Sequence, residues 1–157
     1  MTDALFSTRS LEIKHDGAAY TRVEKTALIA RHKVALRHLH VCWRAGAASN
    51  CGDCAKCMRT MATLQLFGAL HESAMFPPTL DPENLARLYI ENSVEAKFFK
   101  EIEALAVRVG NRDIERAAVQ ALRRSDRLRP AVSAVDRLRD MPLMWRFGPR
   151  LRQWLVG

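Results

Sequence analysis

The sequence predicts a mostly α-helical protein with one or two short strands near its N-terminus. Three observations support this fold class. Apolar residues recur every three or four positions from about residue 54 onward, which is the spacing of one face of an α-helix. Residues that cap helices flank several of these stretches. All four cysteines lie between Cys42 and Cys57, which predicts a cysteine-centred module followed by a helical C-terminal region.

Two short stretches have the apolar–polar alternation of strands. Residues 11–15, LEIKH, alternate in this way and run into Asp16-Gly17, a pair typical of turns. Leu39, Val41 and Trp43 alternate with the residues between them and lead into the cysteine cluster. We therefore expect a strand at one or both of these stretches.

A first helix is predicted after the turn. Thr21 and Glu24 have the capping-box spacing, in which each side chain accepts a backbone N–H at the start of the helix. The spacing of the apolar residues then predicts that Val23, Ala27 and Leu28 are buried.

A second helix is predicted from residue 54 to about residue 67. Gly68 suits its C-terminal end, because glycine readily adopts the left-handed conformation found there. Farther on, Phe76-Pro77-Pro78 breaks any regular element and marks the best internal boundary. We therefore divide the chain into a strand-and-helix segment with the cysteine cluster, residues 1–76, and a basic helical region, residues 77–157. One continuous domain is the alternative.

Three further helices are predicted after this boundary. Asp81-Pro82 combines an N-cap residue with a proline in the first helical position, and Asn92 with Glu95 has the capping-box spacing. The helix after Asn92 ends at Gly110, and residues 111–124 form the next one. From residue 125 onward, prolines predict broken helix and loop, with Trp145 and Trp154 as apolar anchors. The expected inward residues of the two longer helices are Val94, Phe98, Ile102, Leu105, Val109, Ile114, Ala118, Ala121 and Leu122.

Length and composition indicate a folded globular chain. Its 157 residues are 48% hydrophobic and 27% charged, a balance that disordered proteins lack. No apolar run approaches the roughly 20 residues of a transmembrane helix. The first residues, MTDALFSTRS, lack the apolar core and cleavage site of a signal peptide, so we expect a cytoplasmic protein with reduced thiols. Clustered cysteines in that compartment indicate metal or redox chemistry rather than disulfides.

The chain is strongly basic, with a net charge of +8. From Arg108 onward it contains twelve arginines and no lysine, against five acidic residues. Such a charge suits nucleic acid, an anionic membrane surface or a phosphorylated ligand. Solvated helix faces are the alternative explanation, because the charges are dispersed through the helical patterns.

The four cysteines have the spacing C-x8-C-x2-C-x2-C, which suits a metal site. Four thiolates are a ligand set of tetrahedral structural Zn²⁺ sites. Gly52 allows the tight turn between Cys51 and Cys54, and the start of a helix favours thiolates at its first residues. We therefore predict that one structural zinc ion is bound by Cys42, Cys51, Cys54 and Cys57. The sequence offers no catalytic residue and no other cofactor-binding residue.

Two other interpretations of the cluster stay open. Iron–sulfur proteins also use C-x2-C-x2-C, although the proline that usually follows the last cysteine of ferredoxins is missing here. Redox-active thiols need only one CxxC pair. Lys56 and Arg59 are close enough in sequence to offset the net charge of a zinc–tetrathiolate centre. His38 and His40 flank the cluster as alternative ligands or as hydrogen-bond partners of the thiolates.

The run NCGDCAKCMRT, preceded by VCW at the same distance, resembles the cysteine cluster of the 7-cyano-7-deazaguanine synthases and their relatives. These proteins belong to the PP-loop ATP pyrophosphatase (HUP) group, in which a four-cysteine zinc site follows the nucleotide-binding domain. The upstream run STRSLEIKHDGAAYTRVEK is similar to a less characterised branch of the same group. The resemblance covers about residues 6–68 and implies zinc at the same four cysteines.

The chain departs from that group in one respect that decides the expected activity. Those enzymes hold ATP phosphates with an SGGxDS-type loop, whereas the seven glycines here are scattered and no Ser-Gly pair occurs. The chain therefore resembles only the C-terminal portion of such a protein, and the implied partner is a nucleotide-binding domain or chain. We expect a zinc-binding, non-catalytic module with a structural or partner-binding role.

Two alternative functions stay open. In the first, a separate N-terminal domain and this chain together form an ATP-dependent enzyme like a 7-cyano-7-deazaguanine synthase. In the second, the chain is a basic zinc module that binds nucleic acid. The second is less favoured, because zinc fingers that contact DNA do so through the helix beside the metal, whereas the arginines here lie far beyond the cysteines.

Overall fold

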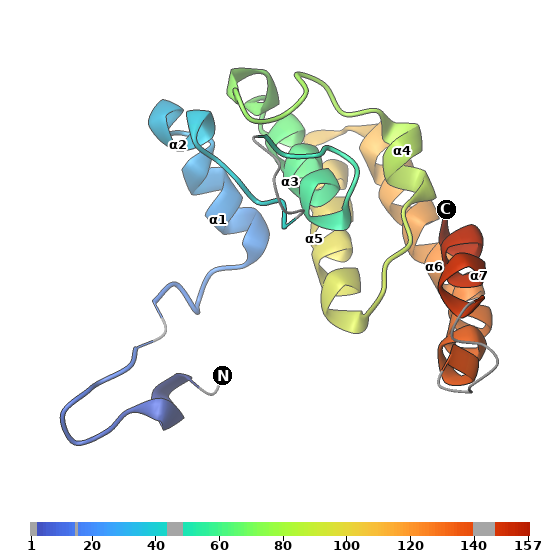
Figure 1. Ribbon diagram of the computed structural model, residues 1–157. Coiled ribbons are helices and arrows are strands. Elements are labelled where there is room, and N and C mark those ends of the chain that lie inside the picture. The colour runs from blue at the N-terminus through green and yellow to red at the C-terminus, as the bar shows by residue number, and fades with distance from the viewer. Residues whose placement is uncertain (1–2, 15, 44–48, 140–146) are drawn as a thin grey trace.

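The computed structural model describes residues 3–14, 16–43, 49–139 and 147–157. Over these residues the chain is mostly helical and contains no strand. None of the described helices is both long and apolar enough to cross a membrane. The elements are η1 (Asp3–Phe6), α1 (Arg22–Ile29), α2 (Lys33–Arg37), α3 (Ala55–Leu66), η2 (Leu70–Glu72), α4 (Pro82–Arg87), α5 (Ser93–Val109), α6 (Arg112–Arg139) and α7 (Gly148–Val156) (Figure 1).

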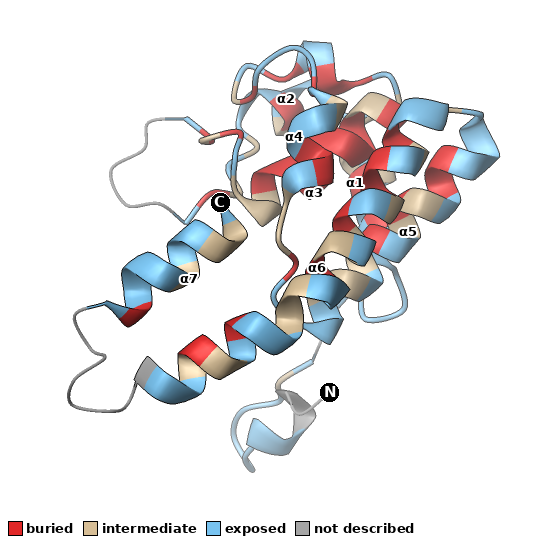
Figure 2. Cartoon of the chain, turned by 90° about the vertical axis from the view of Figure 1, so that its right-hand side faces the viewer, coloured by how far each residue is buried: buried red, intermediate tan, exposed pale blue. Residues whose placement is uncertain are grey.

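Helix α3 lies at the centre of the helical body. It packs against α1 and α5, while α5 packs against the long helix α6. Helix α6 also contacts α4 and α7, and α7 lies alongside the C-terminal part of α6 (Figures 1 and 2). The segment before α1 runs away from this body (Figure 1).

Most of the buried apolar side chains form one cluster, with Ala118, Val132 and Val135 outside it. Helix α3 is buried at every position from Cys57 to Leu64, and Phe99 of α5 and Ile114 of α6 are fully buried. The cluster includes residues on both sides of Pro77 and Pro78. The predicted division at residue 77 stays a prediction.

Several predicted helix ends are confirmed. The Thr21 amide donates to the Glu24 carboxylate at 2.6 Å, and the Glu24 amide donates to the Thr21 hydroxyl at 3.2 Å, which completes the capping box of α1. Asp81 caps α4 through the Glu83 amide. Asn92 caps α5 through the Glu95 amide, and the helix ends at Gly110 with a φ of 74°. The predicted capping box is only half formed, because the Glu95 carboxylate accepts the Glu91 amide and not the Asn92 amide.

The predicted N-terminal strands are absent from the described residues. Residues 11–14 have no regular structure, and His15 lies outside the described residues. Residues 39–43 are irregular because their backbone hydrogen bonds go to a side chain rather than to a second strand. The amides of Val41 and Cys42 both donate to the carboxamide oxygen of Asn50. The alternation does not follow burial either, since Cys42 is buried and Trp43 is 85% exposed.

Some expected inward residues are exposed. Leu28 of α1 was expected to be buried but is 50% exposed. Thr26 is buried in this helix, and its hydroxyl donates to the Arg22 carbonyl. Val94 and Val109 are 61% and 49% exposed, because they lie at the two ends of α5, beyond the part that packs against its neighbours. The buried residues of α5 are Phe99, Ile102, Leu105 and Ala106, whereas Phe98 is half-buried.

The prediction of broken structure after residue 124 is wrong for α6. This helix continues through Pro130 to Arg139. Pro130 is exposed, so water can replace the hydrogen bond that proline removes, and Val132 and Val135 beyond it are buried. Burial of those valines outweighs the local cost of the proline. Trp154 is not an anchor, since it is 78% exposed, and Trp145 lies outside the described residues.

Replacing Pro130 with alanine is expected to stabilise the chain. Alanine restores the missing hydrogen bond and removes the ring, a gain of about 3 kcal/mol that a more flexible unfolded state reduces to about 2 kcal/mol. Urea unfolding monitored by circular dichroism measures the change. Pro149→Ala is the matched control, because Pro149 lies in the first turn of α7, where proline is favoured. Unchanged stability in Pro130→Ala would show that α6 ends before this residue.

Candidate metal centre

The four cysteines reach one place from three parts of the chain. Cys42 lies in the irregular segment after α2, and Cys51 lies in the loop before α3. Cys54 is the N-cap residue of α3, and Cys57 lies in the first turn of that helix. Gly52 has a φ of 78°, a conformation that residues with a side chain rarely adopt, so the predicted tight turn is confirmed.

The sulfur atoms lie near the spacing of a tetrahedral metal site. All four Sγ atoms lie within 4.8 Å of one another. A zinc–sulfur distance of about 2.3 Å at tetrahedral angles places the sulfurs about 3.8 Å apart. The Sγ atoms of Cys51 and Cys57 are separated by 3.7 Å, too far for a disulfide bond and close to that value. The group could therefore hold a metal ion.

Burial and backbone amides determine the chemistry of the thiols. Cys42 and Cys57 are buried, whereas Cys51 and Cys54 are half-buried. Burial raises the pKa of the Cys57 thiol, a backbone hydrogen bond from Gly52 lowers it, and the neighbouring thiols raise it further. The Cys54 amide donates to the Cys51 sulfur at 3.4 Å. Buried sulfurs that are costly to ionise alone become thiolates when a divalent cation among them supplies the positive charge.

Asn50 holds the loop that carries Cys42. Its carboxamide oxygen accepts the amides of Val41 and Cys42 at 2.8 and 3.0 Å. Its nitrogen donates to the carbonyls of Leu39 and Met75 at 2.8 and 3.1 Å. One buried side chain thus fastens the Cys42 loop to the segment that follows η2. Asn50 was not predicted as a site residue, and its position directly before Cys51 is the only sequence signal for this role.

Two basic side chains of α3 lie beside the cysteines, as their sequence positions predict. Burial lowers the pKa of Lys56 and of Arg59, while the electrostatic attraction of Cys54 raises both. Within the described residues, the Lys56 ammonium and the Arg59 Nε are buried without a hydrogen-bond partner. Arg59 also lies over the Phe98 ring, 4.8 Å from its centroid. Such cations suit a site that holds an excess of negative charge.

The structure does not bring the flanking histidines into the group. His38 and His40 are exposed, and the metal-ligating side chains gathered at this place are the four cysteines alone among the described residues. Comparison with known protein families, with curated proteins and with solved structures found no match for this chain. The chemistry of the centre therefore has to be inferred from the chain's own residues.

Proposed function

We propose that this chain is a zinc-binding, non-catalytic helical module in which one Zn²⁺ joins the Cys42 loop, the Cys51 turn and the start of α3. The observation that supports this proposal is the convergence of four sulfurs within 4.8 Å of one another. Four cysteine ligands leave no open position for substrate, which is the property of structural rather than catalytic zinc sites. Lys56 and Arg59 offset the net negative charge of the centre.

The position of the centre indicates a structural role. Helix α3 begins at one pair of the cysteines and continues as the most buried of the described helices. Fastening its first turn to two loops orders the surface around it without placing any reactive group there. The sequence resemblance to the PP-loop ATP pyrophosphatase group extends the proposal: a nucleotide-binding domain or chain is the partner that this module would contact.

The metal content of the purified protein tests the proposal. We expect about one zinc ion per chain by mass spectrometry of the elements, and a colourless protein, because Zn²⁺ has a filled d shell. The serine variant Cys51→Ser is expected to lose the ion, whereas His38→Ala and His40→Ala keep it.

Two results would contradict this function. A brown protein with charge-transfer absorption in the visible range would assign the cysteines to an iron–sulfur cluster. A protein that is fully folded yet free of metal would assign them to thiol chemistry. In the second case, alkylation of all four thiols without loss of helicity would be the supporting measurement.

A further inference from the structure

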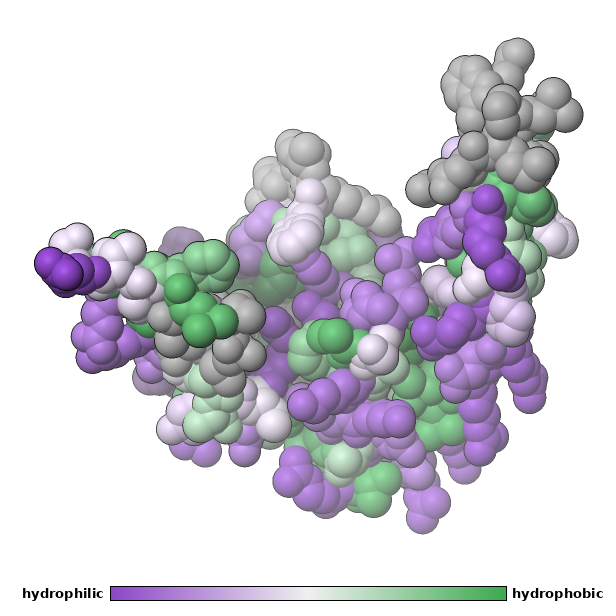
Figure 3. All heavy atoms as spheres, turned by 90° about the horizontal axis from the view of Figure 1, so that it is seen from below, coloured by the Kyte–Doolittle hydropathy of each residue, from purple (hydrophilic) through white to green (hydrophobic). Residues whose placement is uncertain are grey.

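A second feature of the molecule lies away from the cysteines, between α6 and the end of α7. The two helices form a groove of about 880 Å³. In Figure 3, which views the molecule from below, hydrophilic side chains predominate on the right-hand side, where α6 ends and α7 begins, with hydrophobic ones among them. The groove contains four arginines of α6 and a single acidic residue, Glu115. Its lining residues are Glu115, Arg116, Val119, Gln120, Arg123, Arg124, Arg127, Leu128 and Leu155.

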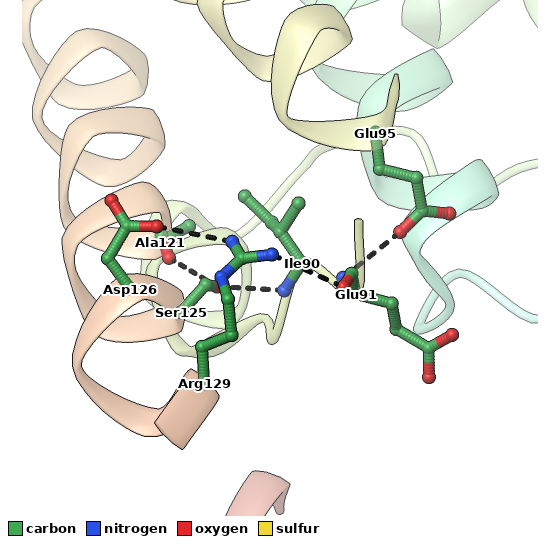
Figure 4. Close-up of polar contacts among 7 residues, drawn as sticks. All are labelled: Ile90, Glu91, Glu95, Ala121, Ser125, Asp126 and Arg129. Atoms are coloured by element: carbon green, nitrogen blue, oxygen red, sulfur yellow. Dashed lines mark hydrogen bonds and ion pairs between the residues drawn. The ribbon is translucent and has the colours of Figure 1, made fainter. Parts of the chain in front are cut away.

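The arginines in the groove differ from those on the other side of α6. Arg129 pairs with Asp126 at 3.1 Å and donates to the Glu91 carbonyl (Figure 4). Arg152 of α7 pairs with Glu91 and Asp136. In contrast, Arg116, Arg123 and Arg127 are exposed, and the described residues provide no ion-pair partner for them. Positive charge is therefore neutralised on one side of the helix pair and left uncompensated in the groove.

The three unpaired arginines form a row. At about 100° and 1.5 Å per residue, positions 116, 123 and 127 lie within roughly 40° of one another around α6 and extend over about 16 Å. A row of this kind suits the successive phosphates of one nucleic-acid strand, since each guanidinium group binds a phosphate through two parallel hydrogen bonds. The fourth arginine, Arg124, is half-buried and donates to the Val156 carbonyl, which holds the end of α7 against the groove.

Helix α7 adds an exposed apolar row next to the groove. Phe147, Leu151 and Trp154 are 62%, 39% and 78% exposed, and their spacing of four and three residues places them on one side of the helix. Leu155, which lines the groove, follows Trp154 directly. Exposed aromatic side chains and unpaired arginines together make a surface that suits single-stranded nucleic acid. The bases of such a strand stack on aromatic rings, and its phosphates bind the cations.

We infer that the α6–α7 groove binds a single strand of nucleic acid, with phosphates along Arg116, Arg123 and Arg127 and a base against Trp154. A duplex keeps its bases stacked inside and would leave the apolar row uncovered. A flat membrane surface does not enter a groove to reach arginines on its walls. This inference goes beyond the zinc-binding module and does not depend on it.

The probe is a fluorescein-labelled single-stranded DNA of about 20 nucleotides and mixed sequence, titrated with the full chain by fluorescence anisotropy at several salt concentrations. We expect the triple variant R116Q/R123Q/R127Q to weaken binding at least tenfold at low salt. It should also reduce the slope of log K against log[salt] by about 2, because each phosphate contact contributes about 0.7. Trp154→Ala is expected to weaken binding roughly tenfold without changing the slope.

Matched variants keep the test specific. The triple variant R9Q/R31Q/R37Q removes the same charge from exposed arginines outside the groove, and Tyr20→Ala removes an exposed aromatic ring; both should bind like the unaltered chain. Circular dichroism and zinc content verify that every variant is folded.

Absence of binding at low salt, equal losses in the two triple variants, or equal affinity for a duplex of the same sequence would each overturn the inference. Loss of binding to phosphatidylglycerol vesicles in R116Q/R123Q/R127Q, with oligonucleotide binding unchanged, would assign the groove to lipid instead.

Discussion

Cys54→Ser is expected to abolish zinc binding and to remove hydrogen-exchange protection from α3. Structural zinc contributes on the order of 10 kcal/mol of apparent binding free energy, because the unfolded chain has no formed site. A small domain has a total stability of about 5 to 15 kcal/mol, so the loss is comparable with the whole. Cys54 is the cysteine to change, because it is half-buried and its serine does not bury a hydroxyl as fully as Cys57→Ser would.

The extent of the unfolding follows from the packing of α3. This helix shares its core with Phe99 and Ile102 of α5, which in turn packs against α6. Metal loss should therefore reduce protection in α5 as well as in α3. The measurement is residue-resolved hydrogen exchange of Cys54→Ser, and of the unaltered chain with and without a strong chelator.

His40→Ala is the control for this experiment, because His40 is exposed near the cysteines and is expected to leave metal and protection unchanged. If protection is lost only between about residues 38 and 68, the division into residues 1–76 and 77–157 is confirmed and the shared core is weaker than its burial indicates. If protection in α3 is unaffected by the loss of metal, the centre is not structural.

Asn50→Ala is expected to lower the free energy of unfolding by about 3 kcal/mol or more. The substitution removes four hydrogen bonds and leaves two backbone amides and the Leu39 carbonyl around a buried position without their partner. The Met75 carbonyl keeps its bond from the backbone amide of residue 50. An unsatisfied buried polar group costs about 1 to 3 kcal/mol, and water entering the vacated space reduces the sum. Because the Cys42 amide is one of these groups, zinc affinity should fall as well.

Two measurements test the role of Asn50. Urea unfolding at fixed zinc concentration gives the stability, and competition with a coloured chelator gives the zinc affinity. Asn111→Ala is the matched control, since the Asn111 side chain accepts a single capping hydrogen bond, from the Ile114 amide at 3.0 Å. Its expected cost is about 1 kcal/mol, with zinc affinity unchanged. An Asn50→Ala variant no less stable than Asn111→Ala would show that other contacts hold the Cys42 loop.

Features set by short-range chemistry could be predicted from the sequence. The capping box at Thr21 and Glu24, the caps at Asp81 and Asn92, and the end of α5 at Gly110 depend on residues within one turn of each other. The gathering of the four sulfurs was predictable for a similar reason, because the cysteines are close in sequence and their spacing leaves few other arrangements.

Features set by distant packing could not be predicted. Alternation at Leu39, Val41 and Trp43 does not reveal that Asn50, rather than a second strand, satisfies the backbone there. The exposure of Leu28 and Val94 depends on where neighbouring helices begin and end. Pro130 is a strong local signal for a break, but the burial of Val132 and Val135 beyond it overrides that signal. The unpaired arginines of the groove became apparent only once the ion pairs on the other side of α6 were known.

The order in which the helices pack has a consequence for the speed of folding. Helix α5 contacts α6, and α6 contacts α7, so these two packed pairs are consecutive along the chain, whereas α1 contacts α5 across α2, α3 and α4. Helical proteins dominated by such local contacts fold in microseconds to milliseconds, because little chain entropy is lost in closing each loop. Cys42 and Cys57 likewise close a short loop. The C-terminal helices can thus assemble quickly, whereas α1 reaches α5 only after a much longer loop has closed.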